Sequence, residues 1–119
     1  MSLALALALL VSSPVELLSR GNQAYEAGRY QAAVALYDSA LVSAYRADLY
    51  YNRGNAHFKL GQIGKATADY LRAHAIKPWD RDIRYNLAFA RQFRPDKRLL
   101  IENPLLRALT QATDSTLTG

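Results

Sequence analysis

Apolar and small residues recur at intervals of three and four along most of this chain, a spacing typical of helices that bury one face. Ala33, Tyr37 and Ala40 follow it, with Leu36 and Leu41 beside them. The pattern predicts an all-α fold. The expected helices span residues 14–27, 30–43 and 81–93, with a further pair of antiparallel helices within residues 48–78.

Residues with known preferences for helix ends mark several of these boundaries. Ser13 can cap the first helix, Pro14 suits the first helical position, and Glu16 completes a capping box. Gly28 and Gly61 follow predicted helices, and glycine readily adopts the left-handed backbone conformation that ends a helix. We therefore expect tight turns at both glycines.

The helix pair within residues 48–78 carries small residues where two helices must touch and aromatic residues where a gap must be filled. The small residues are Gly54, Ala66 and Ala73, and the aromatic residues are Tyr50, Tyr51, Phe58 and Tyr70. A single hairpin of this kind cannot bury its apolar faces alone. The pair should therefore pack between further copies of itself.

The chain supplies such copies. Residues recur 33 positions apart in the pairs Gly21 and Gly54, Gly28 and Gly61, Ala33 and Ala66, Tyr37 and Tyr70, and Ala40 and Ala73. Tyr51-Asn52 recurs 34 positions later as Tyr85-Asn86, with Ala88 in place of the small Gly54. Because a ladder of small residues repeats in register, the sequence indicates a helical repeat protein.

The third copy is incomplete. Asp80 can cap a helix over residues 81–93, but Pro95 falls where the next turn glycine belongs and Pro104 falls inside the expected second helix. We therefore expect a connector, then a short amphipathic helix over residues 105–112 that begins at Asn103-Pro104, and a frayed tail to residue 119.

The repeat length and the order of small, aromatic and closing proline residues resemble the tetratricopeptide repeat. The resemblance implies a right-handed α-solenoid of about two and a half repeats plus a C-terminal helix. The repeats would span residues 14–46, 47–80 and 81–93 within a domain of residues 13–93. Residues 1–12 would precede it as an apolar, signal-like or leader segment, and residues 94–119 would follow it.

In this family the first helix of each repeat lines a concave groove that holds a peptide or helix of a partner protein. The resemblance assigns the groove here to Asn22, Tyr25, Asp48, Tyr51, Asn52, Asn55, Phe58, Lys59, Tyr85, Asn86 and Phe89, and also places Val15, Leu18 and Glu26 on this face. Asparagine amides offer a donor and an acceptor to a peptide backbone, and aromatic rings offer contact area at low entropy cost.

Some of the aromatic residues should instead fill space between helices, and we expect this of Tyr25 and Phe89 more than of Tyr51 and Tyr85. Alanine at Tyr51 or at Asn52 should then abolish partner capture without loss of helical structure.

The best-known groove chemistry of the family is a clamp for the acidic tails of chaperones. Asn22 and Asn52 match its asparagines, but its cationic positions are occupied by Leu18, Asp82 and Asn86. Without a cation a terminal carboxylate is poorly held. The sequence therefore predicts that the groove does not bind chaperone tails.

Composition excludes several other functions. The chain has no cysteine, so it has no disulfide and no thiol chemistry. His57 and His74 have no ligand or catalytic partner at suitable spacing, and Gly64-Lys65 lacks the rest of a phosphate-binding loop. We expect no catalysis, no metal and no cofactor. Both histidines should pack between helices, and Trp79 should pack over the joint between repeats.

The net charge of +5 comes from scattered residues, and the densest group is Arg91, Arg94, Lys97 and Arg98. No nucleic-acid-binding motif accompanies these cations, so nucleic acid is not an expected partner. A solvated helix end explains them, and attraction to an anionic membrane surface is a second interpretation.

Residues 48–92 also resemble the repeat region of the bacterial aerotolerance-operon (Bat-type) family, through the Tyr-Asn starts of two helices and the RYNLAFAR ending at residues 84–91. This resemblance implies a periplasmic or inner-membrane-associated scaffold, with membrane attachment ahead of the repeats. Residues 1–12 suit such a segment but are too short to span a bilayer. A cytoplasmic location stays open.

Two hypotheses of function follow. In the first, the protein is a non-catalytic scaffold that binds another protein in its groove. In the second, it is a structural module that forms homo-oligomers through residues 1–12 and 104–112.

Overall fold

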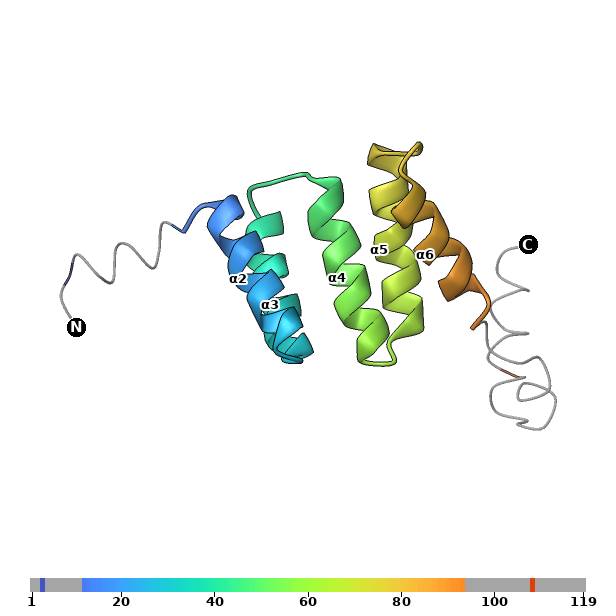
Figure 1. Ribbon diagram of the computed structural model, residues 1–119, viewed down its shortest axis with the longest axis horizontal. Helices are drawn as coiled ribbons and strands as arrows, with labels where there is room; N and C mark the ends of the chain where they lie inside the picture. The colour runs from blue at the N-terminus through green and yellow to red at the C-terminus, as the bar shows by residue number, and fades with distance from the viewer. Residues whose placement is uncertain (1–2, 4–11, 94–107, 109–119) are drawn as a thin grey trace.

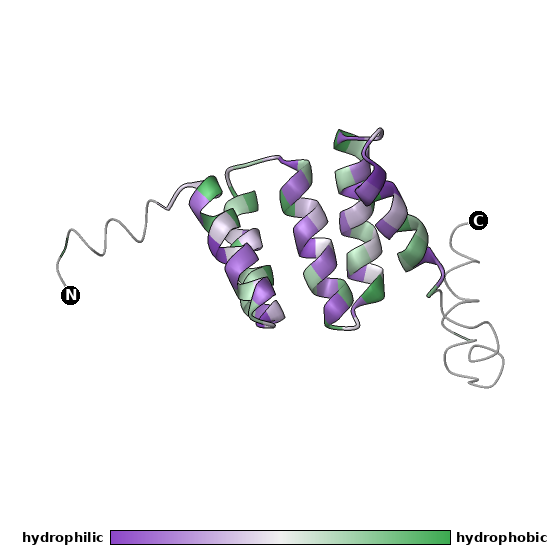
Figure 2. Cartoon of the chain, viewed as in Figure 1, coloured by the Kyte–Doolittle hydropathy of each residue, from purple (hydrophilic) through white to green (hydrophobic). Residues whose placement is uncertain are grey.

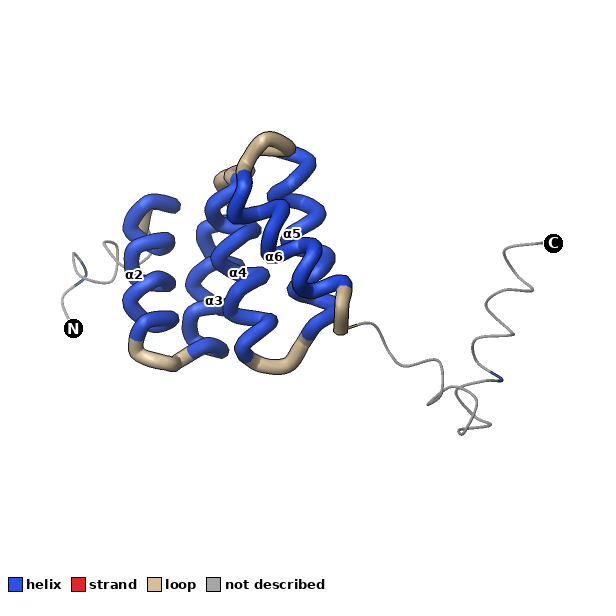
Figure 3. The backbone as a smooth tube through the Cα atoms, turned by 45° about the vertical axis from the view of Figure 1, so that its right-hand side comes forward, coloured by secondary structure: helices blue, strands red, loops and turns tan. Residues whose placement is uncertain are grey.

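The computed structural model describes residues 12–93, together with Leu3 and Ala108. Residues 12–93 contain five helices and no strand: α2 (Pro14–Glu26), α3 (Tyr30–Leu41), α4 (Ala47–Lys59), α5 (Ile63–Ile76) and α6 (Arg81–Arg91). The helices stand side by side in chain order, and those joined by short turns run antiparallel (Figures 1 and 3). The predicted all-α solenoid is confirmed.

The helix boundaries follow local chemistry. The Ser13 hydroxyl accepts a hydrogen bond from the Glu16 N–H (3.2 Å), and the Asp80 carboxylate accepts one from the Ile83 N–H (3.0 Å). Both bonds satisfy N–H groups that have no partner within the helix. Gly28 (φ 76°) and Gly61 (φ 75°) adopt the left-handed conformation that the turns require.

The helices α3 and α6 each end two residues before the predicted boundary, at Leu41 and Arg91. Their last turns tighten, because the N–H of Ser43 bonds to Ala40 O and the N–H of Phe93 bonds to Ala90 O, three residues back instead of four. A tightened final turn leaves no trace in hydrophobic spacing.

The core runs as a chain of buried clusters between successive helices. Ala33, Ala40, Ala66 and Ala73 are fully buried, as expected for positions where helices approach closely. Tyr37 and Leu49 contribute most of the volume between α2, α3 and α4, and Tyr70 does so between α4, α5 and α6. Figure 2 shows apolar and polar residues interspersed along every helix.

The expectation for Trp79 is wrong. Its side chain is 71% exposed and does not cover the joint between repeats. Trp79 lies in the short turn between α5 and α6, which is closed by a hydrogen bond from the Asp80 N–H to Lys77 O (3.1 Å). This closure brings α6 directly against α5, so the joint is filled by Ala73 and Ile83 instead.

A buried ion network joins the first two repeats. The Arg53 guanidinium on α4 binds both carboxylate oxygens of Asp69 on α5 (2.7 and 2.8 Å) and one oxygen of Asp38 on α3 (2.9 Å). Arg72 also donates to Asp69 (2.8 Å), whose side chain is only 1% exposed. Hydrogen bonds to Asp69 are the main cause that raises the pKa of Arg53 above its ordinary value. The network ties three helices together.

His57 lies buried between helices, as predicted, with its Nδ1 2.7 Å from the Gln62 side-chain oxygen. The predicted helix over residues 105–112 and the segments proposed for self-association, 1–12 and 104–112, lie outside the described residues apart from Leu3, Ser12 and Ala108. Within the described part of the chain, no helix is both long and apolar enough to cross a membrane.

Candidate functional site

Two adjoining hollows open along the face formed by α2, α4 and α6. The first is about 280 Å³ and is lined by Asn22, Tyr25, Glu26, Tyr37, Asn52 and Asn55. The second is about 320 Å³ and is lined by Tyr25, Asn55, Phe58, Lys59, Tyr70, Tyr85, Asn86 and Phe89. Tyr25 and Asn55 border both hollows, so together they form one continuous groove.

The groove depends on a close approach between helices at two glycines. A Cβ atom at Gly21 would lie 2.5 Å from the Tyr37 ring, and one at Gly54 would lie 2.8 Å from the Tyr70 ring. Only glycine leaves room for the rings at this separation. Each tyrosine ring therefore packs across the glycine of the neighbouring helix, and its hydroxyl lies at the base of the groove.

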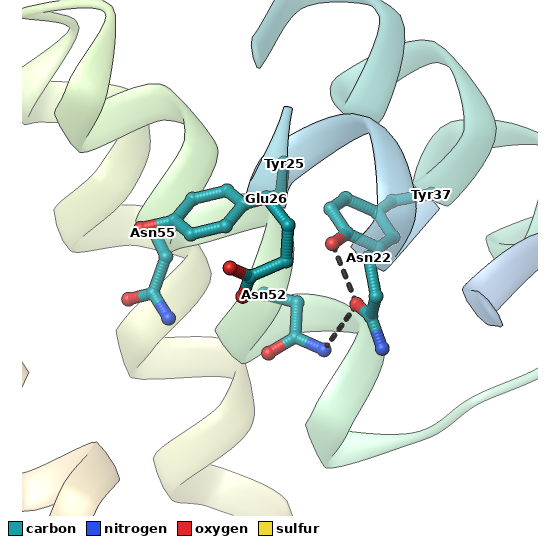
Figure 4. A pocket seen from close by; sticks show the side chains of 6 residues that line it. All are labelled: Asn22, Tyr25, Glu26, Tyr37, Asn52 and Asn55. Carbon is teal, nitrogen blue, oxygen red and sulfur yellow. Dashed lines mark hydrogen bonds between the residues drawn. The ribbon is translucent and has the colours of Figure 1, made fainter. Parts of the chain in front are cut away.

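The two hydroxyls enter a hydrogen-bond pattern that occurs twice. Asn22 Oδ1 accepts a hydrogen bond from the Tyr37 hydroxyl (2.7 Å) and another from Asn52 Nδ2 (3.1 Å), as Figure 4 shows. One repeat later, Asn55 Oδ1 accepts from the Tyr70 hydroxyl (2.6 Å) and from Asn86 Nδ2 (3.0 Å). Each unit thus links the first helix of one repeat to the first helix of the next.

This pattern fixes the orientation of the amides. Because Asn22 Oδ1 and Asn55 Oδ1 each accept two hydrogen bonds, the Nδ2 group of each amide is left as a donor. The Asn22 Nδ2 group makes no hydrogen bond to a described residue, whereas the Asn55 side chain also hydrogen-bonds to the Tyr51 hydroxyl and opposes the rise that burial causes in the Tyr51 pKa. Each amide has two N–H groups and lines the groove, so Asn22 and the second N–H of Asn55 are available to a ligand with acceptor oxygens.

Burial keeps the tyrosine hydroxyls protonated. It is the largest cause that raises the pKa of Tyr37 to about 12, with Tyr25 and Glu26 adding to the effect. Burial likewise raises the pKa of Tyr70 above its ordinary value. At neutral pH both hydroxyls therefore donate to asparagine oxygens and hold the amide donors in place.

The two hollows differ in chemistry. Glu26 gives the first an anionic and polar character. The second combines Lys59 with aromatic rings: Phe89 lies 5.6 Å from Phe58 and stacks parallel to Tyr85 at 6.4 Å between ring centroids. A segment lying along the groove would meet amides throughout, with a carboxylate at one end and a cation beside aromatic rings at the other.

Of the residues assigned to the groove, all except Asp48 and Tyr51 line these hollows. Of those also placed on this face, Glu26 lines the first hollow, whereas Val15 and Leu18 border another hollow along α2. Asp48 lies in the first turn of α4, where its carboxylate pairs with Arg46 (2.7 Å) and accepts a hydrogen bond from the Leu49 N–H. Tyr51 is half-buried against the core, and its hydroxyl accepts a hydrogen bond from Asn86 Nδ2 (3.0 Å). Both residues act within the fold.

The expected ranking of the aromatic residues is only partly right. Tyr85 is 71% exposed and Tyr25 packs against the core, as expected. The roles expected for Tyr51 and Phe89 are reversed. Phe89 is 40% exposed at the open end of the groove, whereas Tyr51 fills space beside Tyr70. Tyr37 and Tyr70 were not expected in the groove, since the sequence pattern placed Tyr37 on a buried helix face and Tyr70 in a gap between helices. The hydroxyl groups of these two tyrosines, which phenylalanine would lack, are the feature of the sequence that could have indicated a place in the groove.

Comparison with known proteins identifies the repeat. Residues 47–80 match the family model of the tetratricopeptide repeat, the same bounds as the complete middle repeat expected from the sequence. The chain contains a tetratricopeptide repeat at residues 47–80. Part of it is 39% identical over 61 residues to the TPR repeat-containing thioredoxin TTL4 of Arabidopsis thaliana, and 42% identical over 57 residues to human tetratricopeptide repeat protein 16.

These alignments cover 50% and 47% of this chain but only 9% and 6% of the two relatives. Among solved structures, the first TPR of Spaghetti (RPAP3) bound to the HSP90 peptide SRMEEVD superimposes with a TM-score of 0.64 and 20% identity. That match covers 90% of this chain and 97% of the other. At this identity the likeness establishes the fold.

Proposed function

We propose that this tetratricopeptide repeat protein is a non-catalytic scaffold whose groove holds an extended segment of another protein. The observation that carries the proposal is the repeated Asn–Tyr–Asn unit, which leaves the Nδ2 donors of Asn22 and Asn55 in the groove. An extended peptide presents backbone carbonyls along its length, and these are the acceptors that such donors require. The similarly folded domain that binds an HSP90 peptide supports peptide binding in general.

The ends of the groove favour a particular kind of segment. Lys59 beside Phe58 and Phe89 suits an apolar side chain with an acidic residue next to it. Glu26 in the first hollow suits a basic or hydroxyl-bearing side chain. We therefore propose a partner segment whose charge changes from basic to acidic along the groove.

The segment is proposed to be internal to its protein rather than an acidic C-terminal tail. The positions where the family holds a terminal carboxylate are occupied by Leu18, Asp82 and Asn86. Asp82 would repel a carboxylate, and Asn86 is already engaged with Asn55 and Tyr51. The prediction against chaperone-tail binding thus stays part of the proposal.

The setting of this binding is also a proposal. A periplasmic or membrane-associated complex of the aerotolerance type rests on the resemblance of residues 48–92 alone. The relatives described above come from a plant and from primates and add no support to it. Identification of the partner in cells, by cross-linking from the groove, would decide the setting.

Peptide selection followed by NMR tests the groove itself. Random peptides would be selected on the full chain, and a selected peptide titrated into the ¹⁵N-labelled protein. We expect the side-chain amide signals of Asn22 and Asn55 to shift on addition of peptide, while that of Gln31, exposed on α3, stays in place. Shifts confined to residues outside the groove would refute the assignment.

Self-assembly remains the alternative. Light scattering on the full chain and on a chain lacking residues 1–12 separates the two hypotheses. A shortened chain that is monomeric and still binds the selected peptide supports the scaffold. A full chain that forms oligomers in which the groove amide signals are already shifted without peptide supports self-assembly.

A further inference from the structure

The last helix, α6, exposes a cationic face that adjoins the groove at Tyr85. Arg81, Arg84 and Arg91 are exposed, and together with Leu87, Ala88 and His74 of α5 they border a shallow hollow of about 540 Å³. None of these three arginines forms a salt bridge with a described residue. We call the surface formed by Arg81, Arg84, Leu87, Ala88 and Arg91 the end face.

Equivalent positions in the earlier repeats show which residues the end-face arginines replace. The residues equivalent to Arg84 are Leu17 and Tyr50, and those equivalent to Arg91 are Ala24 and His57. These equivalents are buried or half-buried where α2 packs on α3 and α4 packs on α5. Arg81 likewise stands where the second repeat has Ala47, which is 4% exposed. The third copy therefore has arginines at positions that the earlier copies pack between helices with alanine, leucine, tyrosine or histidine.

The substitution changes what the end face can bind. A second helix with an apolar surface, like α3 or α5, would bury guanidinium groups without partners, which is strongly unfavourable. A helix that carries carboxylates opposite the arginines would neutralise them through paired hydrogen bonds. Leu87 and Ala88 between the arginines supply a small apolar floor for the same helix.

We infer that the end face binds an acidic amphipathic helix of a partner protein, in the place that a second helix of the third repeat would occupy. Arg84 and Arg91 are seven residues apart, which is about 10.5 Å along a helix. Acidic residues seven positions apart on the partner helix match this separation, with an apolar residue between them over Ala88. The inference is independent of peptide binding in the groove.

The test uses a synthetic helical peptide as the probe. It carries two glutamates seven positions apart with leucine between them, and its control carries glutamine at both glutamate positions. Binding to the full chain is measured by fluorescence anisotropy at low and at physiological salt. We expect the glutamate peptide to bind at least tenfold more tightly than the glutamine peptide.

Two double variants with equal loss of charge locate the site. Arg84→Gln with Arg91→Gln should weaken binding of the glutamate peptide at least tenfold. Arg20→Gln with Arg29→Gln, at exposed arginines of the first repeat without a salt bridge to a described residue, should change it less than twofold. Circular dichroism checks that both variants keep their helices.

Three results would overturn the inference. Equal weakening in both double variants would show non-specific attraction to the net charge of +5. Absence of binding by the glutamate peptide would show that the end face takes no acidic helix. Binding of phosphatidylglycerol vesicles that depends on Arg84 and Arg91, with no binding of the peptide, would assign the end face to a membrane surface.

Discussion

Tyr37 and Tyr70 each combine a core ring with a hydroxyl in the groove, and this gives the protein a pH-dependent stability. Their pKa values are raised by burial, for Tyr37 from 10.0 to about 12. The neutral hydroxyl is therefore favoured in the folded state. The stabilisation is fully present below pH 10 and is lost as the pH rises through 12.

The change Tyr37→Phe tests this account, because it keeps the ring and removes the group that ionises. In urea unfolding below pH 10, the variant should be less stable by about 1 kcal/mol, the value of the lost hydrogen bond to Asn22. Between pH 10 and 12 the wild type should lose more stability than the variant. Parallel losses in the two proteins would show that Tyr37 does not cause the effect.

Tyr51 illustrates how the structure changes the meaning of a mutation. From the sequence, Tyr51→Ala would test the groove. The side chain instead packs against two buried clusters and does not line either hollow. We expect Tyr51→Ala to lower the free energy of unfolding by about 2 kcal/mol. Thermal unfolding measures this, and an unchanged melting temperature would contradict the assigned packing role.

At the scale of elements, the contact between α4 and its neighbours combines small residues with one ion network. Asp69 on α5 is buried and is bound by Arg53 of α4 and Arg72 of its own helix, whereas Asp38 on α3 has a side chain that is 55% exposed. A buried pair that loses one partner is strongly destabilised, while an exposed pair contributes little.

The two aspartates therefore form a matched pair of variants. Asp69→Asn should lower the free energy of unfolding by about 3 kcal/mol, because it leaves the Arg53 guanidinium partly buried without its main partner. Asp38→Asn removes the same charge and should cost less than about 1 kcal/mol. Urea denaturation compares them, and equal effects would show that burial at Asp69 is not what gives the network its strength.

Local patterns in the sequence were sufficient to predict the elements. Gly28 and Gly61 end helices, Ser13 and Asp80 begin them, and the small residues at Gly21 and Gly54 mark where helices touch. Each of these signals is local, or recurs at a fixed interval, so it survives without knowledge of the three-dimensional arrangement.

What the sequence could not provide are contacts between residues whose pairing depends on helix rotation. The repeat pattern does not indicate that Arg53 and Asp69 form a pair. The hydrogen bond from Tyr37 to Asn22 forms only because the tyrosine ring packs across Gly21. The prediction for Trp79 was wrong for a related reason, because the length of one turn decides whether its side chain faces the joint between repeats.

For the whole molecule, the groove and the end face are two surfaces with different chemistry. The groove offers amide donors between an anionic and a cationic end. The end face offers arginines that have no salt bridge to a described residue, around a small apolar floor. Tyr85 borders both surfaces, so variants of Tyr85 would mix the two activities. Variants of Asn55 and of Arg91 separate them and should act additively.

The variant Asn55→Asp tests whether the amide donor of Asn55 binds a peptide in the groove. It keeps an oxygen to accept the hydrogen bonds from Tyr70 and Asn86 and replaces the Nδ2 donor, which faces the groove and the Tyr51 hydroxyl. The matched control is Gln31→Glu, which introduces the same charge at an exposed position on α3. Affinity for a peptide selected on the wild-type chain is measured by isothermal titration calorimetry. We expect Asn55→Asp to fold with unchanged helical content and to bind the peptide at least tenfold more weakly. The control should bind it like the wild type. Undiminished binding by a folded Asn55→Asp protein would contradict this expectation.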